Sequence, residues 1–502
     1  MKKSVIWLLL CAALWAESAL RLSLSGFPAR LNPLLATDTV SGELSGWLFN
    51  GLVKYDKNAN IVGDIALSWR FSDPRTIVFT LRRDRFWHDG KRVTAKDAIF
   101  TYETATSDKI STPYNSNFES IESIEAIDDF TLRVRYKTPY FKALETWMMG
   151  LIPKHILEND PDLMTSPFNS KPIGNSYYLL PEKISPSKNV ELLAFRDYKP
   201  RPPLIDKVAF EYIQEPSVEF LKLKSRSLDI GSLEAAQLER QLDDRFRDDY
   251  QIVENSSFSY TYLGFNLNNP KFQNPKVREA FSYAIDRGEL IDILYLGHGK
   301  VCNGPILEGA LGYDPNVRSP EKDANRAKRL LAEAGYDKNN PLIIEISTNS
   351  NNPTRMYAAQ IIQRQLMDVG VTVRLRAMEW QAFLSRVVHA RNFEVMLMGW
   401  TVPLTPDLFP IWHSSADRPG GFNFAGYKND EADRLIERAK STADRNEVAR
   451  IFSELSEIIV RDNPYIFLYV PSAINAVSRR IEPIEPTIVG FTHNIQDWRI
   501  AP

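Results

Sequence analysis

The clearest alternation of apolar and polar positions lies in the segment 61–103. Residues 76–81 alternate between the two classes, which predicts a half-buried strand. The His-Asp-Gly tripeptide at 88–90 predicts a turn, because Gly tolerates the positive φ that closes it. Thr94 and Asp97 then have the spacing of a capping box, and apolar residues follow at helical spacing. The segment therefore predicts a strand, a turn and a capped helix.

Strand and helix patterns alternate along the second half of the chain. Strands are expected at residues 260–268, 343–347, 372–375 and 395–399, and helices at 277–285, 323–334, 352–368 and 446–461. Gly335 and Gly370 follow two of these helices and are expected to end them. This alternation favours a mixed or parallel sheet, and hence an α/β fold.

The first half of the chain has similar signals. Residues 20–24 predict a strand, residues 41–55 a helix that ends at Gly51-Leu-Val53, and residues 121–136 two strands around the Asp128-Asp129 turn. No internal repeat, low-complexity tract or flexible linker separates these elements. The 31 prolines are scattered at turns and element starts, which favours domains joined by crossing strands over domains on a linker.

Length and composition set the class of protein. At 502 residues the chain is too long for one hydrophobic core, so two or three domains are expected. Its 44% hydrophobic and 25% charged residues are those of a globular chain. With 61 Lys and Arg against 63 Asp and Glu, the net charge of −2 gives no basic excess, so a nucleic-acid partner is not expected.

The N-terminus has the pattern of a secretory signal peptide. Lys2 and Lys3 precede an apolar run to Trp15, and a small residue, Ala16, stands at the expected cleavage site. The run is too short to cross a membrane. The mature chain would keep one cysteine, Cys302, so no disulfide can form within it, and Cys302 is expected to be a buried small hydrophobe.

The segment 61–103 also carries four short motifs in a fixed order. They are Ile65-Ala-Leu-Ser-Trp69, Phe79-Thr-Leu-Arg82, Phe86-Trp-His-Asp-Gly90 and Thr94-Ala-Lys-Asp-Ala98. This set resembles the signature of the family 5 extracellular solute-binding proteins, the dipeptide- and oligopeptide-binding proteins of ABC importers. Further motifs, such as the one at 277–287, extend the resemblance over nearly the whole mature chain.

The resemblance implies a fold, a division into domains and a role. The fold is the type II periplasmic-binding-protein fold in its large three-domain form, with two lobes, a hinge and a ligand cleft between them. The signal peptide would occupy residues 1–16, domain I residues 17–58, 170–262 and 472–502, domain II residues 59–169, and domain III, the ligand-binding lobe, residues 263–471. The role implied is that of a monomeric periplasmic receptor without a cofactor, which delivers a short peptide or similar small solute to an inner-membrane ABC permease.

The motifs of common enzymes are missing from the sequence. None of the six histidines lies in an HExxH pattern, and neither a GxSxG elbow nor a GxxxxGK[ST] phosphate loop occurs. Asp and Glu residues are plentiful, but their spacing does not define a catalytic pair. An enzyme is therefore not expected, and an exported hydrolase is the alternative from a different class.

Residues 399–413 resemble the ligand loop of peptide-binding relatives, whose pattern is roughly GWxxDxxDP. Residues 399–401 fit this pattern, but Pro403 replaces the Asp that pairs with a peptide's α-ammonium group. Asp407, four residues later, is the candidate replacement. The arginine that holds the carboxylate in dipeptide binders has no clear counterpart. Arg355 is the nearest cation; a surface charge is the role expected for it, with ligand binding as the alternative.

Large aromatic residues complete the candidate site. The alternative to ligand contact is ordinary core packing for these aromatic residues. For Asn266 the alternative is a hydrogen bond in the hinge. A nickel-binding branch of the same family is an alternative function, but only His413 lies near Trp400 in sequence, so no metal ligand is assigned. The predicted ligand-binding residues are Trp400, Thr401, Asp407, Trp380, Asn266, Phe422 and Arg355, with Phe424 as a further aromatic candidate.

Overall fold

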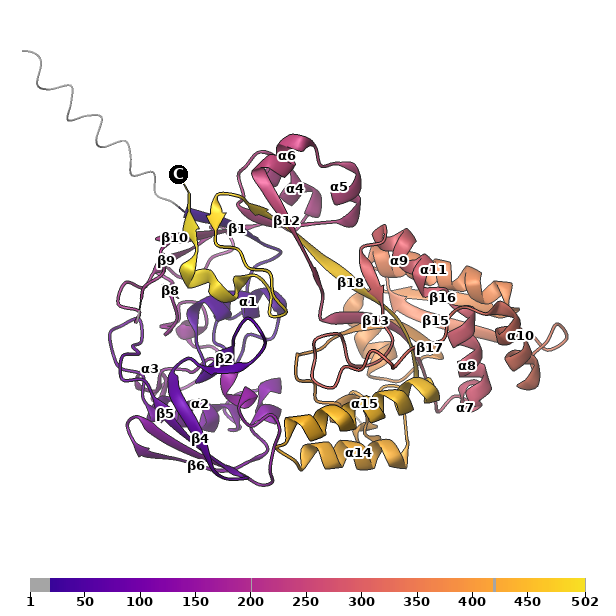
Figure 1. The fold of residues 1–502 in the computed structure, drawn as a ribbon, viewed down its shortest axis with the longest axis horizontal. Helices are drawn as coiled ribbons and strands as arrows, with labels where there is room; N and C mark the ends of the chain where they lie inside the picture. Colours follow the sequence, from indigo (N-terminus) through magenta and orange to yellow (C-terminus); the bar gives the residue numbers. More distant parts are fainter. Residues whose placement is uncertain (1–18, 200, 419–420, 502) are drawn as a thin grey trace, which may run out of the picture. The chain divides into compact units, whose positions relative to one another are not determined.

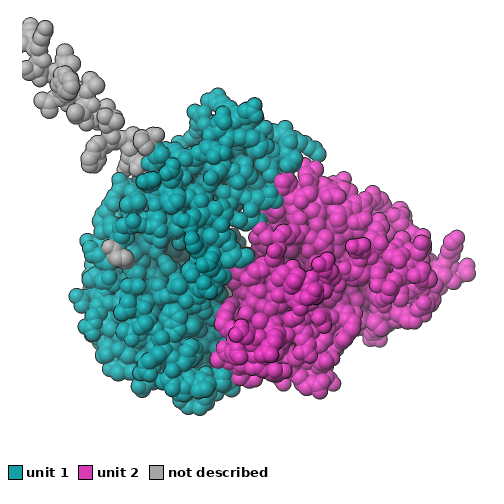
Figure 2. All heavy atoms as spheres, in the orientation of Figure 1, with its two compact units in different colours: residues 1–255, 474–502 teal, residues 256–473 magenta. Residues whose placement is uncertain are grey.

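The computed structural model describes residues 19–199, 201–418 and 421–501 (Figure 1). The predicted signal peptide, residues 1–16, lies outside them. The chain divides into two compact units, coloured teal and magenta in Figure 2: unit 1 holds residues 1–255 and 474–502, and unit 2 holds residues 256–473. Both points of division fall inside single strands, β12 (Tyr250–Ser256) and β18 (Tyr465–Ser478). The predicted division of the chain into domains I, II and III stays a prediction.

The described part of unit 1 contains two four-stranded sheets. One has the order β1-β10-β9-β8, with β1 parallel to β10, and the other is the antiparallel sheet β4-β5-β7-β6. The strands are β1 (Ala19–Leu24), β2 (Val53–Tyr55), β3 (Ile61–Gly63), β4 (Ala66–Asp73), β5 (Thr76–Leu81), β6 (Ile121–Asp128), β7 (Thr131–Tyr136), β8 (Tyr178–Leu179), β9 (Val190–Ala194), β10 (Lys207–Tyr212), β11 (Ile230–Leu233), β19 (Ile481–Glu482) and β20 (Arg499–Ile500). The helices are α1 (Thr39–Leu48), α2 (Ala95–Ala105), α3 (Lys154–Leu157), α4 (Pro216–Lys224), α5 (Ala235–Arg240) and α6 (Asp244–Asp249).

The strand and capped helix predicted within 61–103 are confirmed as β5 and α2, and Thr94 and Asp97 form the capping box. The half-buried character predicted for β5 is wrong, because every residue of β5 except Thr80 is buried. β5 is a central strand of its sheet, and Val78 lies between Arg133 of β7 and an arginine of β4. Long arginine stems can cover apolar surface, which explains burial on the polar face as well.

The helix predicted at 41–55 is too long. α1 ends at Leu48, Phe49 takes an extended conformation, and β2 begins at Val53. The backbone N–H of Leu52 donates to the carbonyl of Trp147 at 2.8 Å. This long-range contact holds the segment after α1 in an extended form, so the helix ends before the predicted end at Gly51-Leu-Val53.

Unit 2 is built on a mixed sheet with the order β18-β13-β17-β15-β16. β15 is parallel to β16 and β17, whereas β13 is antiparallel to β17 and β18, so the predicted mixed sheet is confirmed. The strands that lie wholly in unit 2 are β13 (Ser259–Phe265), β14 (Gly299–Val301), β15 (Ile343–Asn349), β16 (Thr372–Met378) and β17 (Val395–Thr401). Its helices are α7 (Pro270–Gln273), α8 (Pro275–Ala284), α9 (Arg287–Tyr295), α10 (Ala324–Glu333), α11 (Pro353–Asp368), α12 (Trp380–Phe383), α13 (Phe409–Trp412), α14 (Asp430–Lys440) and α15 (Arg445–Asp462).

Residues of α8, α9 and α11 pack with residues of this sheet in the core of unit 2. Gly335 and Gly370 follow α10 and α11 with φ near +91° and +92°, as predicted for C-cap positions. Cys302 is 1% exposed, and burial raises the pKa of its thiol to about 12, which makes it an unreactive buried side chain. No helix among the described residues is long and apolar enough to cross a bilayer.

A buried ion cluster joins the C-terminal segment to the rest of unit 1. Asp229, just before β11, accepts hydrogen bonds from Arg21 of β1 (Nη2 to Oδ1, 2.8 Å) and from Arg480 (Nε to Oδ1, 2.7 Å). Burial acts to raise the pKa of Asp229, but the hydrogen bonds from Arg21 and Arg480 outweigh it and lower the pKa below the usual 3.8. Asp229 therefore holds together segments that are 208 and 251 residues away from it in sequence.

Candidate ligand-binding site

The carboxyl ends of three parallel strands meet at one edge of the unit 2 sheet. β15, β16 and β17 end there at Asn349, Met378 and Thr401. In open α/β sheets this is the edge at which ligands bind. α11 starts shortly after β15 and α12 shortly after β16, so both helices begin near this edge. All seven predicted ligand-binding residues lie in unit 2.

An aromatic cluster surrounds Trp400, the second-last residue of β17. The half-buried Trp400 ring lies parallel to Phe424, with centroids 5.9 Å apart, and parallel to Tyr262 of β13 at 6.4 Å. Phe422 meets the Trp400 ring edge-on at 6.0 Å and is 45% exposed. The structure thus brings Trp400, Phe422 and Phe424 together at the end of β17. Phe424 is buried, as its core-packing alternative expects, whereas Trp400 and Phe422 leave part of their rings exposed as an apolar wall.

Arg355 lies in the first turn of α11. Its Nη1 donates to Oδ1 of Asn349 at 2.7 Å, and its backbone N–H donates to the N-cap residue Asn352 at 2.8 Å. Gly399 of β17 allows the guanidinium to lie close to the sheet, because a Cβ there would be 3.2 Å from Nη2 of Arg355 and 2.9 Å from the carbonyl oxygen of Tyr260. Among the described residues no carboxylate pairs with Arg355.

The surroundings of Arg355 leave its charge uncompensated. Burial lowers the pKa of the Arg355 guanidinium, and Tyr469, Tyr262 and Tyr295 partly offset this effect. Arginine nevertheless stays charged in proteins. An exposed surface charge does not fit this half-buried position, where the N-terminal end of a 16-residue helix adds positive potential. Such a site can bind a carboxylate through charge-assisted hydrogen bonds.

Asp407 and Asn266 already have partners in the protein. Oδ1 of Asp407 accepts from the backbone N–H of Phe409 at 3.0 Å, in the turn that leads into α13. The Asn266 amide donates to the carbonyls of Arg391 and Phe393, at 3.3 and 3.0 Å. Both side chains therefore hold loops of unit 2, and contact of either with a ligand stays a prediction.

The remaining predicted residues lie at the same sheet edge. Trp380 is the first residue of α12 and packs against Phe383 at 6.1 Å, while Thr401 is the exposed last residue of β17. Sequence reasoning missed Tyr262 and Asn349. A signal for Asn349 was present, since it is a polar residue close behind a predicted strand of a parallel sheet.

Comparisons with known proteins agree on one family and cover most of the chain. The model of the bacterial extracellular solute-binding proteins, family 5, matches residues 60–422. The oligopeptide-binding protein AppA of Bacillus subtilis is 30% identical over 495 residues, which cover 95% of this chain and 90% of that protein.

Two solved structures are similar over nearly their full length. The structure of Bacillus subtilis AppA with a nonapeptide has a TM-score of 0.81 and 28% identity, and covers 96% of this chain and 99% of that chain. The structure of NikZ from Campylobacter jejuni with Ni(L-His) has a TM-score of 0.83 and 27% identity, and the covered shares are again 96% and 99%. The periplasmic-binding-protein fold is thereby confirmed.

Proposed function

The chain belongs to family 5 of the bacterial extracellular solute-binding proteins, and we propose that it captures short peptides and delivers them to the permease of an ABC importer. It is a solute-binding protein and not an enzyme. The AppA relative is named for oligopeptide binding and its structure holds a nonapeptide, which supports a peptide ligand here. In this proposal residues 1–16 direct export, the mature protein works in the periplasm as a monomer, and no nucleic acid takes part.

The observation that carries the proposal is the uncompensated charge of Arg355 beside the aromatic wall of Trp400. A peptide offers a carboxylate for the guanidinium and an apolar side chain for the wall. Pro403 stands where the resemblance to peptide binders implies an ammonium-binding Asp, and Asp407 is engaged with Phe409. The peptide is therefore held by its carboxylate and side chains, and a free α-amino group is not required.

Calorimetry with purified, unfolded and refolded protein tests peptide capture. Unfolding releases any solute bound during expression, and the refolded protein is then free of it. For di- and tripeptides with an apolar side chain, we expect a heat of binding that saturates as a single binding site fills. If no peptide binds while another class of solute does, the peptide proposal fails although the chain remains a solute-binding protein.

Trp400→Ala should weaken peptide binding by about 1–3 kcal/mol, or roughly five- to 140-fold, because it removes the apolar wall. Asp407→Asn is the matched change in the same loop. It should alter affinity by less than about twofold, because the carboxylate is occupied by Phe409 N–H and not by ligand. Isothermal titration of both variants with one tripeptide gives the comparison. The reverse order of effects would assign the ammonium anchor to Asp407.

The NikZ structure with Ni(L-His) favours a metal chelate as the second candidate ligand. A histidine chelate also carries a carboxylate group, which Arg355 could hold in the same way. The described residues include no group of three His, Cys, Asp or Glu side chains placed to hold a metal ion. Adding Ni(L-His) to the tripeptide titration separates the two candidates: a chelate that binds more tightly than every peptide would replace the peptide proposal.

A further inference from the structure

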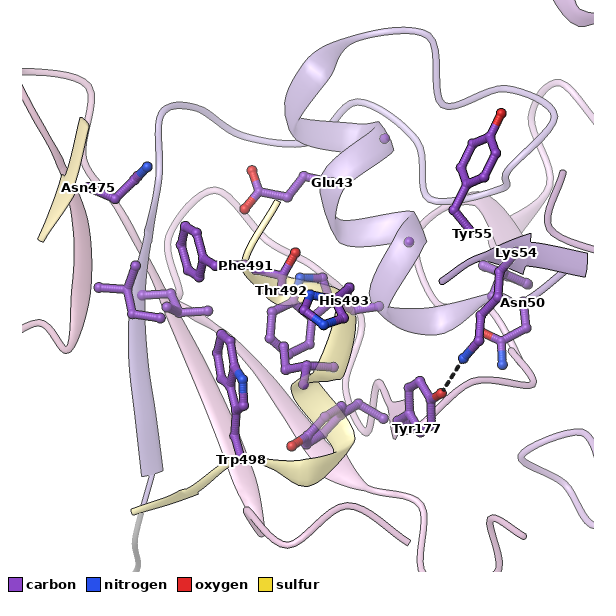
Figure 3. Close-up of a pocket in the computed structure, with 18 of the residues that line it drawn as sticks. Glu43, Asn50, Lys54, Tyr55, Tyr177, Asn475, Phe491, Thr492, His493 and Trp498 are labelled. Carbon is purple, nitrogen blue, oxygen red and sulfur yellow. Dashed lines mark hydrogen bonds between the residues drawn. The ribbon is translucent and has the colours of Figure 1, made fainter. Parts of the chain in front are cut away.

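Unit 1 contains a cavity of about 700 Å³, and none of the residues proposed to bind a peptide lines it. Figure 3 shows the residues around it, which come from α1, the strands next to α1 and the C-terminal segment. Every residue that lines it belongs to unit 1, whereas all the residues of the candidate ligand-binding site belong to unit 2. The volume lies within the range of small-molecule sites, roughly 300–1,000 Å³.

Two glycines of α1 leave this cavity open. Gly42 and Gly46 are one helical turn apart, and a Cβ at either would meet no atom within 4 Å. Neither has a positive φ, so neither is required by backbone conformation. Glycine inside a helix costs about 0.5–1 kcal/mol relative to Ala. The helix therefore keeps an unfavourable residue at two positions where a side chain would narrow the cavity.

The cavity has aromatic walls. Trp498 is fully buried and lies parallel to Phe491, with centroids 6.2 Å apart. Trp47 of α1 is half-buried and packs edge-on against Tyr178 and Phe210 at 5.5 and 5.4 Å. Aromatic surfaces with a few polar groups between them are typical of sites for small organic molecules.

One end of the cavity is negative. The carboxylates of Glu43 on α1 and Glu219 on α4 line it, and neither has an ion-pair partner among the described residues. Glu219 accepts from the Ser23 hydroxyl at 2.6 Å and from the Ser232 backbone N–H at 2.9 Å, whereas Glu43 is open to solvent.

The other end is positive. Nζ of Lys54 is 3.0 Å from the Tyr177 hydroxyl and 4.0 Å from Oδ2 of Asp64, and Asp64 also pairs with Arg85 at 3.4 Å. One carboxylate thus serves two cations, which leaves a net charge of at least +1. Figure 3 shows Glu43 and Lys54 well apart, with the ring of His493 between them in the view.

We propose that this cavity is a second ligand-binding site, which takes a small zwitterion with its ammonium group at Glu43 and its carboxylate group at Lys54. The aromatic walls contact the chain that links the two charges. A site of this kind goes beyond the proposed peptide capture, because it is built from unit 1 alone and does not require Arg355 or Trp400. Its ligand class is defined by opposite charges at the two ends of the molecule.

Fluorine NMR of the full chain labelled with fluorinated tryptophan tests this proposal. A Trp47→Phe variant assigns the Trp47 resonance, and a Trp400→Phe variant assigns that of Trp400. An ω-aminohexanoate should shift the Trp47 resonance saturably and leave the Trp400 resonance unchanged. Hexylamine and hexanoate, which each carry one of the two charges, should bind about tenfold more weakly or not at all.

Variants of α1 complete the test. Glu43→Gln should weaken aminohexanoate binding about tenfold or more, and Gly46→Leu should abolish it by filling the cavity. Glu103→Gln, an exposed helical carboxylate of α2, is the matched control and should bind like the parent protein. The proposal is overturned if Trp47 does not respond to the zwitterion, if hexanoate or hexylamine binds equally well, or if Glu43→Gln binds normally. None of these results depends on whether peptides bind in unit 2.

Discussion

Replacing Arg355 with Gln is expected to weaken binding of a short peptide by about 1.5–3 kcal/mol, or roughly ten- to a hundredfold. The guanidinium is half-buried, bonded to Asn349, and without a carboxylate partner among the described residues. A peptide carboxylate would supply the missing charge in a place where water is partly excluded, and such charge-assisted bonds are the strong ones. Isothermal titration with one tripeptide measures the loss.

The same helix offers a matched control. Arg364 is 51% exposed and pairs with Glu289, so Arg364→Gln removes the same charge from α11 without touching the site. It should leave affinity within about twofold. The parent protein should bind a C-terminally amidated peptide weakly and an N-acetylated peptide normally. The Arg355→Gln protein should bind the amidated peptide and the peptide acid, which has a free C-terminal carboxylate, with equal affinity. Equal binding of acid and amide by the parent protein would remove Arg355 from the site.

Asp229→Asn is expected to destabilise unit 1 by about 3 kcal/mol. Asp229 is 1% exposed and bonded to both Arg21 and Arg480, so the substitution leaves two arginines without their counter-charge. Removing one member of a buried ion cluster costs about 3–5 kcal/mol, and the lower end applies because the arginines are 37% and 35% exposed to water. Urea unfolding measures the free energy of unfolding. The backbone N–H of Arg21 donates to Asp229 at 2.8 Å, so faster hydrogen exchange at this amide would show that the loss of stability lies in unit 1.

The effect of Asp229 has a defined pH dependence. Its pKa in the folded protein lies below the 3.8 of an ordinary Asp, so its contribution is present above about pH 3.8 and is lost as pH falls through the folded value. The difference in stability between the parent and Asp229→Asn should be constant near neutral pH and shrink below about pH 4. Asp249→Asn, which breaks an ion pair with the 53% exposed Arg226, should cost less than about 1 kcal/mol. Equal losses for both variants would contradict the account.

Local signals in the sequence were enough for most of the fold. The Thr94–Asp97 capping box, Gly335 and Gly370 each mark a helix end through contacts within a few residues, and the structure has the ends where these signals place them. The errors arise where distant segments decide. α1 stops at Leu48 because the following segment bonds to Trp147, and no pattern near α1 encodes that contact.

The candidate site was less predictable for the same reason. The apolar character of Trp400, Phe422 and Phe424 is evident from the sequence. Their ring contacts, however, depend on how the segment that holds Phe422 and Phe424 folds against the end of β17. Arg355 lies 44 residues before Gly399, and its burial depends on strand β17 lying next to β15. The sheet register and the side-chain contacts together show that the arginine is half-buried and has no carboxylate partner among the described residues.

Mass spectrometry of the solute released from freshly purified, denatured protein tests the central claim most directly. A protein that captures peptides retains them through purification, and denaturation releases them for sequencing. We expect short peptides with free carboxyl ends in about equimolar amount, and we expect none in material prepared from Arg355→Gln protein. Release of a sugar, a metal chelate or another solute in place of peptides would contradict the central claim.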